Sequence, residues 1–324
     1  NKNTNTRIIK MTVIQDLKEG EKVFVHYLCK HKTSAVTKNG KPYETATLQD
    51  KTGTIEAKIW DPNNAGIDDF EAMDYVEIYG DVNSFQSALQ INVKRTRCAK
   101  AGEYAPENYL PVSAYNVEDM YGEVMQYIKK ISNPYLQKLC QKFFVEDKEF
   151  VEKFKTNSAA KTVHHGFVGG LLEHTLSVVK LCDFYCTRYK KLNRDLLITA
   201  ALCHDIGKVL ELSAFPMNDY TDDGNFLGHI VMGTEMVGEK IREIDGFPAR
   251  ISSELKHCIL SHHWEFEFGS PKKPAIIEAV ALNFADNTDA KLETFTELLE
   301  NTSEKGWLGF NRLLDSNITA TRME

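Results

Sequence analysis

The pattern of apolar and polar positions changes near residue 100. Before that point, short runs alternate apolar and polar side chains and are rich in β-branched and aromatic residues, which is typical of strands. Turn residues separate the first three runs, with Asn39-Gly40 in one gap and residues 50–53 in the next. We expect a loop and a short helix over 62–73, before the fourth run. The predicted strands are 23–30, 43–48, 54–60, 74–82 and 87–93.

Further along the chain, apolar residues recur every three or four positions, the spacing of amphipathic helices. Pro106 and Pro111 lie between the two patterns and break both of them. We therefore expect a domain at 1–100, a linker at 101–117 and a helical domain with a C-terminal tail at 118–324. The predicted helices are 116–131, 134–144, 148–154, 170–189, 194–209, 228–244, 250–260 and 274–289.

Five strands with a helix after the third fit a small all-β barrel of the OB type, which often binds single-stranded nucleic acid on one face. The expected fold class is thus multidomain, with an OB-type barrel followed by an all-α domain. Alternation along 54–60 places Lys58 and Trp60 on one polar face, opposite the apolar residues. An exposed aromatic ring beside a cation suits base stacking and phosphate contact. The candidate nucleic-acid-binding residues are Lys58, Trp60, Phe85, Lys94, Arg95 and Arg97.

Two alternatives remain open for this surface. Trp60 could close one end of the barrel, and the basic residues between 94 and 97 could be a solvated strand exit. Charge does not decide between them. Residues 1–100 carry 15 Lys and Arg against 13 Asp and Glu, whereas the remainder carries 24 against 33. The acidic excess therefore lies in the helical part, which could hold cations.

Composition narrows the class of protein. With 42% apolar and 26% charged residues, the 324-residue chain falls in the globular range. No apolar run approaches the roughly 18 residues of a membrane span, so we expect no membrane partner. Seven scattered cysteines without a CxxC pair argue against a disulfide framework and a thiolate zinc site. Residues 1–10 lack the apolar segment of a secretory signal, so we expect a cytoplasmic protein.

The candidate chemistry lies in the helical part. His204 and Asp205 end an apolar run at 200–203, and Lys208 follows them. Burying an imidazole, a carboxylate and an ammonium group without a counter-ion or a phosphate would be costly, which favours a functional site. Imidazole and carboxylate ligands suit Mn, Fe, Zn and Ni, and the carboxylates also suit Mg. The metal-type residues of this part are His164, His165, His174, His204, Asp205, His229, His262, His263 and Asp286.

The order of these residues over roughly 160–290 resembles that of the HD metal-dependent phosphohydrolases, all-helical enzymes that cleave phosphomonoesters or phosphodiesters. With the barrel before it and the run His164 to His174, the chain is more narrowly similar to the YhaM-type 3′→5′ exoribonucleases. Those enzymes join an OB nucleic-acid-binding domain to an HD nuclease domain. The resemblance therefore implies an HD-type helical domain after the barrel.

The resemblance also implies residue roles. It assigns the principal metal ion to His174, His204, Asp205 and Asp286. The positions that hold a second ion in two-metal members correspond to His229 and His262, with His263 as the competing choice for the latter, and Asp205 would bridge the two ions. We expect one or two divalent ions, with Mn²⁺ as the first choice and Mg²⁺, Fe²⁺, Ni²⁺ and Zn²⁺ as alternatives.

Three further candidates carry competing interpretations. Lys208 follows His204 by four residues, so on one helix it would share a face with the ligands and could hold a phosphate oxygen. A cation favoured by a helix C-terminus is an equal alternative. Glycines at 166, 169 and 170 precede a helix start that could receive a phosphate, with His164 and His165 touching substrate, but tight packing explains the same glycines. For Asp289, a plain surface acid is favoured over a carboxylate that supports a metal ligand.

The leading hypothesis is a metal-dependent 3′→5′ exoribonuclease that acts on single-stranded RNA, and also on single-stranded DNA, to release nucleoside 5′-monophosphates. The polarity and the preference for RNA come from the resemblance alone. The alternatives are an HD phosphohydrolase of a small nucleotide and a non-catalytic nucleic-acid-binding adaptor with a structural metal. The tail at 294–324 contains Trp307, Leu308, Phe310 and Leu313, so we expect it to dock on its own or a neighbouring subunit of a homo-oligomer.

Overall fold

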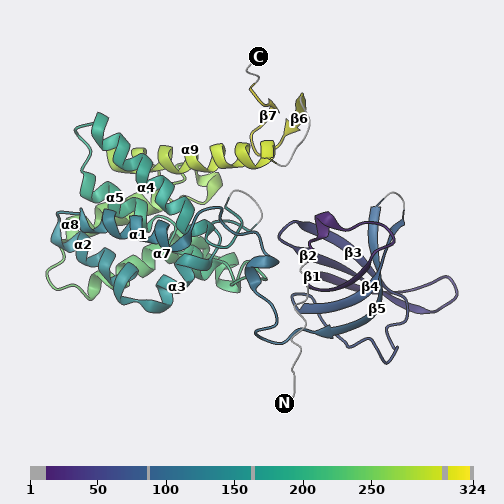
Figure 1. Cartoon of the computed structure of the whole chain (residues 1–324). Coiled ribbons are helices and arrows are strands. Elements are labelled where there is room, and N and C mark those ends of the chain that lie inside the picture. The colour runs from purple at the N-terminus through teal and green to yellow at the C-terminus, as the bar shows by residue number, and fades with distance from the viewer. Residues whose placement is uncertain (1–11, 86–87, 162–164, 301–305, 322–324) are drawn as a thin grey trace. The chain divides into compact units, whose positions relative to one another are not determined.

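The computed structural model describes residues 12–85, 88–161, 165–300 and 306–321 (Figure 1). The chain forms two compact units, Asn1–Val112 and Ser113–Glu324. The boundary between them falls inside 101–117, the segment expected to be a linker. His164 lies outside the described residues, so the structure gives no account of it.

The first unit is a closed five-stranded barrel in the order β1-β2-β3-β5-β4. Neighbouring strands pair antiparallel except β3 and β5, which run parallel. A closed five-stranded barrel with this crossover is an OB-type fold, so this part of the predicted fold class is confirmed. The strands are β1 (Lys22–Val36), β2 (Pro42–Asp50), β3 (Gly53–Ile59), β4 (Tyr75–Phe85) and β5 (Ala88–Cys98).

Alternation in β3 places side chains as the sequence predicts. Ile55, Ala57 and Ile59 are buried in the barrel core, and Trp60 is exposed just after the strand. The short helix expected within 62–73 is absent from the described chain, which forms turns there. Ile67 and Phe70 have helical spacing, but both pack on the barrel core, and Ile67 bridges to β5. The contacts of Ile67 and Phe70 with the barrel therefore determine the local structure, and their helical spacing does not.

The second unit is helical, and several of its helices begin at a side-chain cap. Asn116, Asn133, Asp147 and Asn193 each accept hydrogen bonds from backbone N–H groups of the first turn. The core lies around α4 and α5, whose apolar residues are almost all buried. The helices are α1 (Val117–Lys129), α2 (Pro134–Gln141), α3 (Lys148–Thr156), α4 (Gly170–Arg188), α5 (Arg194–Cys203), α6 (Lys208–Glu211), α7 (Asp222–Arg242), α8 (Ala249–Ser261) and α9 (Ile277–Glu300), with a π-helical turn at Lys142–Glu146.

Three predicted helices differ from the observed ones. The predicted helix 194–209 is interrupted after Cys203, because the chain turns at 204–207 to bring Gly207 against the backbone of α7. A Cβ atom on Gly207 would lie 2.1 Å from the carbonyl oxygen of His229, so only glycine fits there. Helix α7 begins six residues earlier than expected and contains a non-helical Gly228. Helix α9 continues to Glu300 and absorbs the start of the expected tail.

The rest of the tail forms a hairpin of β6 (Trp307–Asn311) and β7 (Ser316–Thr319). Trp307, Phe310 and Leu313 are largely exposed on this hairpin. Of the four apolar side chains expected to dock, these three are therefore largely uncovered within the described part of this single chain, whereas Leu308 is half-buried. No described helix combines the length and the apolar character that crossing a bilayer would require.

Candidate metal centre

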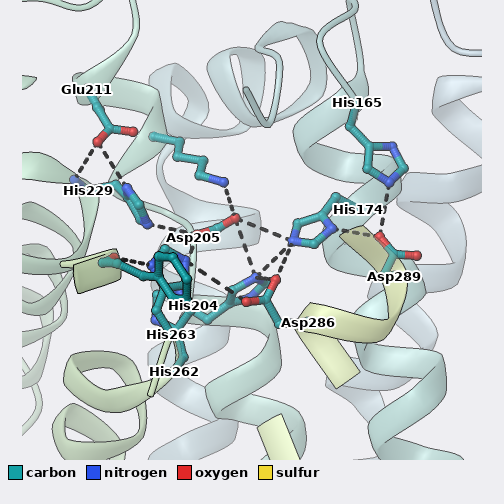
Figure 2. A network of polar contacts seen from close by, with 12 residues as sticks. His165, His174, His204, Asp205, Glu211, His229, His262, His263, Asp286 and Asp289 are labelled. Carbon is teal, nitrogen blue, oxygen red and sulfur yellow. Dashed lines mark hydrogen bonds and ion pairs between the residues drawn. The ribbon is translucent and has the colours of Figure 1, made fainter. Parts of the chain in front are cut away.

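The structure gathers all seven sequence-predicted ligand residues at one point in the helical unit (Figure 2). They come from elements far apart in the sequence. One lies in α4, two follow the end of α5, one lies in α7, two follow the end of α8, and one lies in α9. In the same order, these residues are His174, His204, Asp205, His229, His262, His263 and Asp286.

Asp205 is the hub of this cluster. Its side chain is 2% exposed, and each carboxylate oxygen faces a different pair of histidines. Oδ2 lies 3.5 Å from Nε2 of His174 and 3.4 Å from Nε2 of His204. Oδ1 lies 3.4 Å from Nε2 of His229 and 3.6 Å from Nε2 of His262. Asp205 therefore lies between two groups of imidazoles.

Asp286 supplies the second carboxylate. Its Oδ1 lies 3.1 Å from Nε2 of His174, and its Oδ2 lies 4.0 Å from Nε2 of His263. Nε2 of His174 is also only 3.2 Å from Nε2 of His204. Two imidazole nitrogens that face each other this closely need a shared proton or a shared cation.

The opposite nitrogen of each histidine explains why Nε2 points inward. In all five rings, Nδ1 lies within hydrogen-bond distance of an oxygen that can only accept, so it carries the hydrogen. Nε2 is then left with the lone pair that binds a metal. The Nδ1 partners are Asp289 Oδ2 for His174 at 2.7 Å, the Ala201 carbonyl for His204 at 2.8 Å, Glu211 Oε1 for His229 at 2.9 Å, the Ile259 carbonyl for His262 at 2.7 Å and the Phe268 carbonyl for His263 at 2.7 Å.

Several inward-facing atoms are buried without a hydrogen-bond partner among the described residues. They are Nε2 of His229, Nε2 of His262 and Oδ1 of Asp205. Native proteins rarely leave buried polar atoms unpaired, because each costs about 1–3 kcal/mol. Two groups have donor atoms within 4.8 Å of one another, His174 with His204 and Asp286, and His229 with His262 and His263. The residues therefore fit one or two divalent cations.

The electrostatic surroundings of His262 and Asp205 favour the protonation states that bind a cation. Burial, followed by the neighbouring His263 and His204, holds the pKa of His262 well below its usual range and keeps the ring neutral. Burial alone would raise the pKa of Asp205, but Lys208 and the surrounding histidines hold it well below its usual range, so this carboxylate is ionised. A neutral imidazole beside a carboxylate anion is the ligand set that a divalent cation requires.

His174 behaves differently in the metal-free protein. Burial opposes its protonation, but the hydrogen bonds to Asp286 and Asp289 outweigh burial and raise the pKa of His174 to about 10. The raised pKa stabilises the metal-free fold fully below pH 6.5, and this contribution is lost as the pH rises through about 10. A metal ion that binds Nε2 must displace the proton.

We therefore predict that metal binding releases close to one proton from His174 at pH 7.5. The apparent affinity should rise about tenfold per pH unit over the range in which His174 is protonated. Titration calorimetry in two buffers of different ionisation enthalpy measures the proton release directly. A heat of binding that is the same in both buffers would show that His174 is already neutral.

The local structure of Lys208 differs from expectation. It begins the single turn of α6 and does not lie near the end of a helix that runs from 194 to 209. Its Nζ lies 2.6 Å from Oδ2 of Asp205. Lys208 also lines a cavity of about 630 Å³, together with His174, Glu211, His229, His263 and Asp286.

Of two supporting carboxylates, the sequence analysis missed Glu211 and favoured the wrong alternative for Asp289. Glu211 accepts hydrogen bonds from the backbone N–H and the ring of His229. The sequence offered one indication of this role for Glu211, which is that an acidic residue stands within an apolar run. Asp289 was expected to be a surface acid, which is wrong, because it is mostly buried and one oxygen accepts from both His174 and His165. The hydroxyl of Ser177 donates to the other oxygen.

His165 lies beside this supporting shell. Its Nε2 is 3.0 Å from Oδ2 of Asp289, and the side chain is 2% exposed (Figure 2). His165 is not among the residues that line the cavity. At Gly170, a Cβ atom would lie 2.0 Å from the His165 carbonyl oxygen, so tight packing accounts for this glycine.

On the barrel, the candidates Lys58 and Trp60 form a small patch with Tyr43 and Asn92, in which Trp60 is exposed and the other three residues are half-buried. Trp60 is 52% exposed, so it does not close the barrel end. Its ring stacks on Tyr43, and its Nε1 donates to Oδ1 of Asn92 at 3.1 Å. Lys58 lies within 3.0 Å of the Thr45 hydroxyl and of the Glu56 carboxylate.

The other barrel candidates are dispersed. Phe85 is exposed at the end of β4. Lys94 pairs with Asp81, and Arg97 pairs with Glu77 and Glu103. Strand β5 continues to Cys98, so these basic residues belong to a strand and not to a strand exit. Arg95 is exposed.

Comparison with known proteins places this geometry in a family. The HD domain model matches residues 171–291, and an HD domain implies a divalent metal. A 3′-5′ exoribonuclease YhaM from Geobacillus sp. (strain WCH70) is 37% identical over 284 residues, which cover 87% of this chain and 86% of that protein. The protein of the same name from Bacillus pumilus is 36% identical, covering 87% and 88%.

Among solved structures, the second OB-fold domain of replication protein A from Methanococcus maripaludis matches 29% of this chain and 98% of its own, at 20% identity and a TM-score of 0.23. The sequence relatives are far closer. A third YhaM exoribonuclease, from Bacillus velezensis, is 37% identical over 87% of this chain and 88% of its own. With this identity along most of both chains, the protein belongs to the YhaM family of 3′-5′ exoribonucleases.

Proposed function

We propose that this chain is a metal-dependent 3′→5′ exoribonuclease that hydrolyses single-stranded RNA, and also single-stranded DNA, to nucleoside 5′-monophosphates. The observation that carries the proposal is the convergence of five imidazole Nε2 atoms and two carboxylates beside a cavity. Relatives that are named as exoribonucleases and span most of the chain support the reaction class.

The two ligand groups on either side of Asp205 support one or two divalent ions, with Mn²⁺ as our first choice over Mg²⁺, Fe²⁺, Ni²⁺ and Zn²⁺. When bound, such ions activate a water and neutralise charge on a phosphoryl group. His174, His204 and Asp286 would hold the principal ion, with Asp205 between it and the second group. His229 and both His262 and His263 would form the second group.

Lys208 has a separate role in this proposal. Its ammonium lines the cavity next to Asp205, where it binds a non-bridging oxygen of the scissile phosphate and offsets its charge. Burial would lower the pKa of Lys208, but Asp205 raises it above its usual value, so the cation persists at neutral pH. His165 is not itself among the residues that line the cavity, and we propose that it acts on His174 through Asp289.

The reaction is tested with metal-stripped protein on single-stranded RNA labelled at its 5′ end, with Mn²⁺, Mg²⁺ or no metal added back. A ladder that shortens from the 3′ end only with metal, together with nucleoside 5′-monophosphates on chromatography, is expected. A parallel reaction with single-stranded DNA tests the second substrate. RNA that stays intact with every ion would refute the exonuclease.

The barrel patch provides the strand-binding surface in this proposal, because stacked aromatics hold bases regardless of sequence. Replacing Trp60 by alanine removes the exposed ring and is expected to weaken RNA binding by about 1–3 kcal/mol, or roughly five- to 150-fold in Kd. Fluorescence anisotropy with a labelled oligonucleotide in chelator measures binding without hydrolysis. Phe24→Ala, which removes an exposed aromatic of β1 outside the patch, is the matched control and should bind normally.

One observation favours a second candidate, hydrolysis of a small nucleotide. Lys94 and Arg97 are engaged in ion pairs within the barrel, which leaves its basic character weak. Such an enzyme would hydrolyse a cyclic dinucleotide at the same rate in the Trp60→Ala variant as in the wild type. The exonuclease predicts slow or absent turnover of that substrate and a loss of RNA degradation in the variant.

We also propose that the chain forms a homo-oligomer in the cytoplasm. The exposed Trp307, Phe310 and Leu313 of the β6–β7 hairpin support self-association, because several large apolar side chains exposed on one hairpin are typical of an interaction surface. The free cysteines suit a reducing compartment. Light scattering of the wild type and of a Trp307→Ser, Phe310→Ser variant tests the assembly, and a monomeric wild type would refute it.

A further inference from the structure

A separate cluster of ligand-type side chains, called the His165 cluster, lies next to the metal centre. It consists of His165, from the segment before α4, with Glu173 of α4 and Glu293 of α9. One ligand atom from each residue lies within 4.8 Å of the others. Along α9, Asp286, Asp289 and Glu293 follow one another at spacings of three and four residues, so they share one helical face. The His165 cluster is therefore about one helical turn beyond Asp289.

The hydrogen bonding of His165 determines which ring nitrogen is free. Its Nε2 lies 3.0 Å from Oδ2 of Asp289, the same oxygen that accepts from His174. Because an ionised carboxylate can only accept, Nε2 of His165 carries the hydrogen. The other nitrogen, Nδ1, is then left with a lone pair.

That lone pair is buried and unpartnered. Nδ1 of His165 has no hydrogen-bond partner within the described part of the chain, and the side chain is 98% buried. The nitrogen faces Oε1 of Glu173 at 3.9 Å, which is too long for a hydrogen bond. A nitrogen lone pair and a carboxylate oxygen repel each other across this gap unless a proton or a cation lies between them.

The surrounding charge is negative. Glu173 is largely buried, and its other oxygen accepts from the Ser113 hydroxyl. Burial raises the pKa of Glu293, His165 opposes this, and Glu173, Glu297 and Asp289 raise it further. Among the described residues, neither Glu173 nor Glu293 forms an ion pair with a lysine or an arginine. Within the described part of the chain, these carboxylates therefore lack a compensating lysine or arginine.

We propose that Nδ1 of His165, with the carboxylates of Glu173 and Glu293, binds a divalent transition-metal ion at a site separate from the seven-residue metal centre. One imidazole and two carboxylates form a ligand set suited to Mn²⁺, Fe²⁺ or Zn²⁺. Two ligand atoms that each lie about 2.1 Å from one ion are about 3–4 Å apart, which matches the 3.9 Å between Nδ1 and Oε1.

This site is connected to the metal centre through hydrogen bonds. A cation on Nδ1 makes the N–H at Nε2 a stronger donor to Asp289, and Asp289 in turn orients His174. An ion bound at the His165 cluster would thus support the ligand geometry of the seven-residue metal centre. The proposal does not depend on the reaction that the metal centre performs, since it rests on the local ligand set alone.

The test counts the Mn²⁺ ions bound by the full chain. Metal-stripped wild type, Glu173→Gln and Glu293→Gln are titrated with Mn²⁺, and free Mn²⁺ is followed by electron paramagnetic resonance. Each variant is expected to bind one ion fewer than the wild type. The matched control is Glu235→Gln on α7, an exposed glutamate outside both groups, which should bind the full number. An equal count and affinity in all four proteins would overturn the proposal.

Two additional measurements separate this site from the metal centre and from misfolding. An Asp205→Asn variant should retain the ion at His165 while losing affinity at the centre. Anomalous diffraction from Mn²⁺-soaked wild-type crystals should give a peak within coordination distance of Nδ1 of His165, whatever the variants do. No peak there, with the metal centre occupied, would mean that His165 is an imidazolium paired with the two glutamates and that the site does not exist.

Discussion

Replacing Asp205 by asparagine is expected to lower the rate of RNA hydrolysis by at least about 10³-fold, the largest effect of any single substitution in this protein. Asp205 faces two imidazoles of each group, with Nε2 atoms 3.4 to 3.6 Å from its two oxygens. Its loss removes the charge shared between the two groups. If metal ions lower the barrier by several kcal/mol, the loss of about 4 kcal/mol corresponds to this factor.

Replacing Asp205 by asparagine also leaves the buried ammonium of Lys208 without its anionic partner, so a second variant is needed to separate lost activity from lost stability. Lys208 pairs with Asp205 at 2.6 Å, and a buried cation left without its partner costs about 3–5 kcal/mol. The double variant Asp205→Asn, Lys208→Met removes both charges and should fold more stably than the single variant. It should be equally inactive, because neither substitution restores the carboxylate.

Thermal melting and the RNA gel assay together decide the outcome. Full metal-dependent degradation by a folded Asp205→Asn variant would exclude the proposed centre. A double variant that is folded and inactive assigns the loss to the site and not to unfolding. The control Asp183→Asn, on the opposite end of α4 where Asp183 pairs with Arg194, should retain normal activity.

The members of the candidate metal centre were named in advance because their order along the chain resembles that of the HD phosphohydrolases, and His204 and Asp205 also stand out by their apolar setting. The structure then places them together, since helix ends and faces from five helices meet there. The two-unit fold and the alternation of β3 were also predictable, because the apolar periodicity changes near residue 100.

The supporting carboxylates were not predictable from one sequence. Asp289 follows Asp286 on the same helix and Glu211 stands in an apolar run, and a helical acid looks the same in sequence whether it faces water or a histidine. Their role depends on which helix packs opposite, as when α9 brings Asp289 against His165 and His174. The break after Cys203 was missed for a similar reason, since it depends on the close approach of Gly207 to α7.

Replacing Asp289 by alanine is expected to weaken metal binding at the centre by about 10–100-fold, with the protein still folded. Asp289 fixes the ring of His174 through Nδ1 and supplies a negative charge behind it. Asp289 does not line the cavity, so it is a positioning residue, and activity at saturating metal should recover most of the wild-type rate. Calorimetric titration with Mn²⁺ measures the affinity, and unchanged affinity would contradict the role.

The pH dependence of this loss separates positioning from a general effect on stability. Asp289 also helps to raise the pKa of His174, so its removal lowers that pKa and weakens the competition between the proton and the metal ion. At neutral pH this gain partly offsets the lost support, whereas at higher pH, where the wild-type proton leaves more easily, the offset shrinks. The affinity deficit of Asp289→Ala should therefore widen as the pH rises from about 6.5 to 8.5, and fewer protons should be released per ion than in the wild type. A deficit that is constant with pH would mean that Asp289 acts on the metal centre without acting through His174.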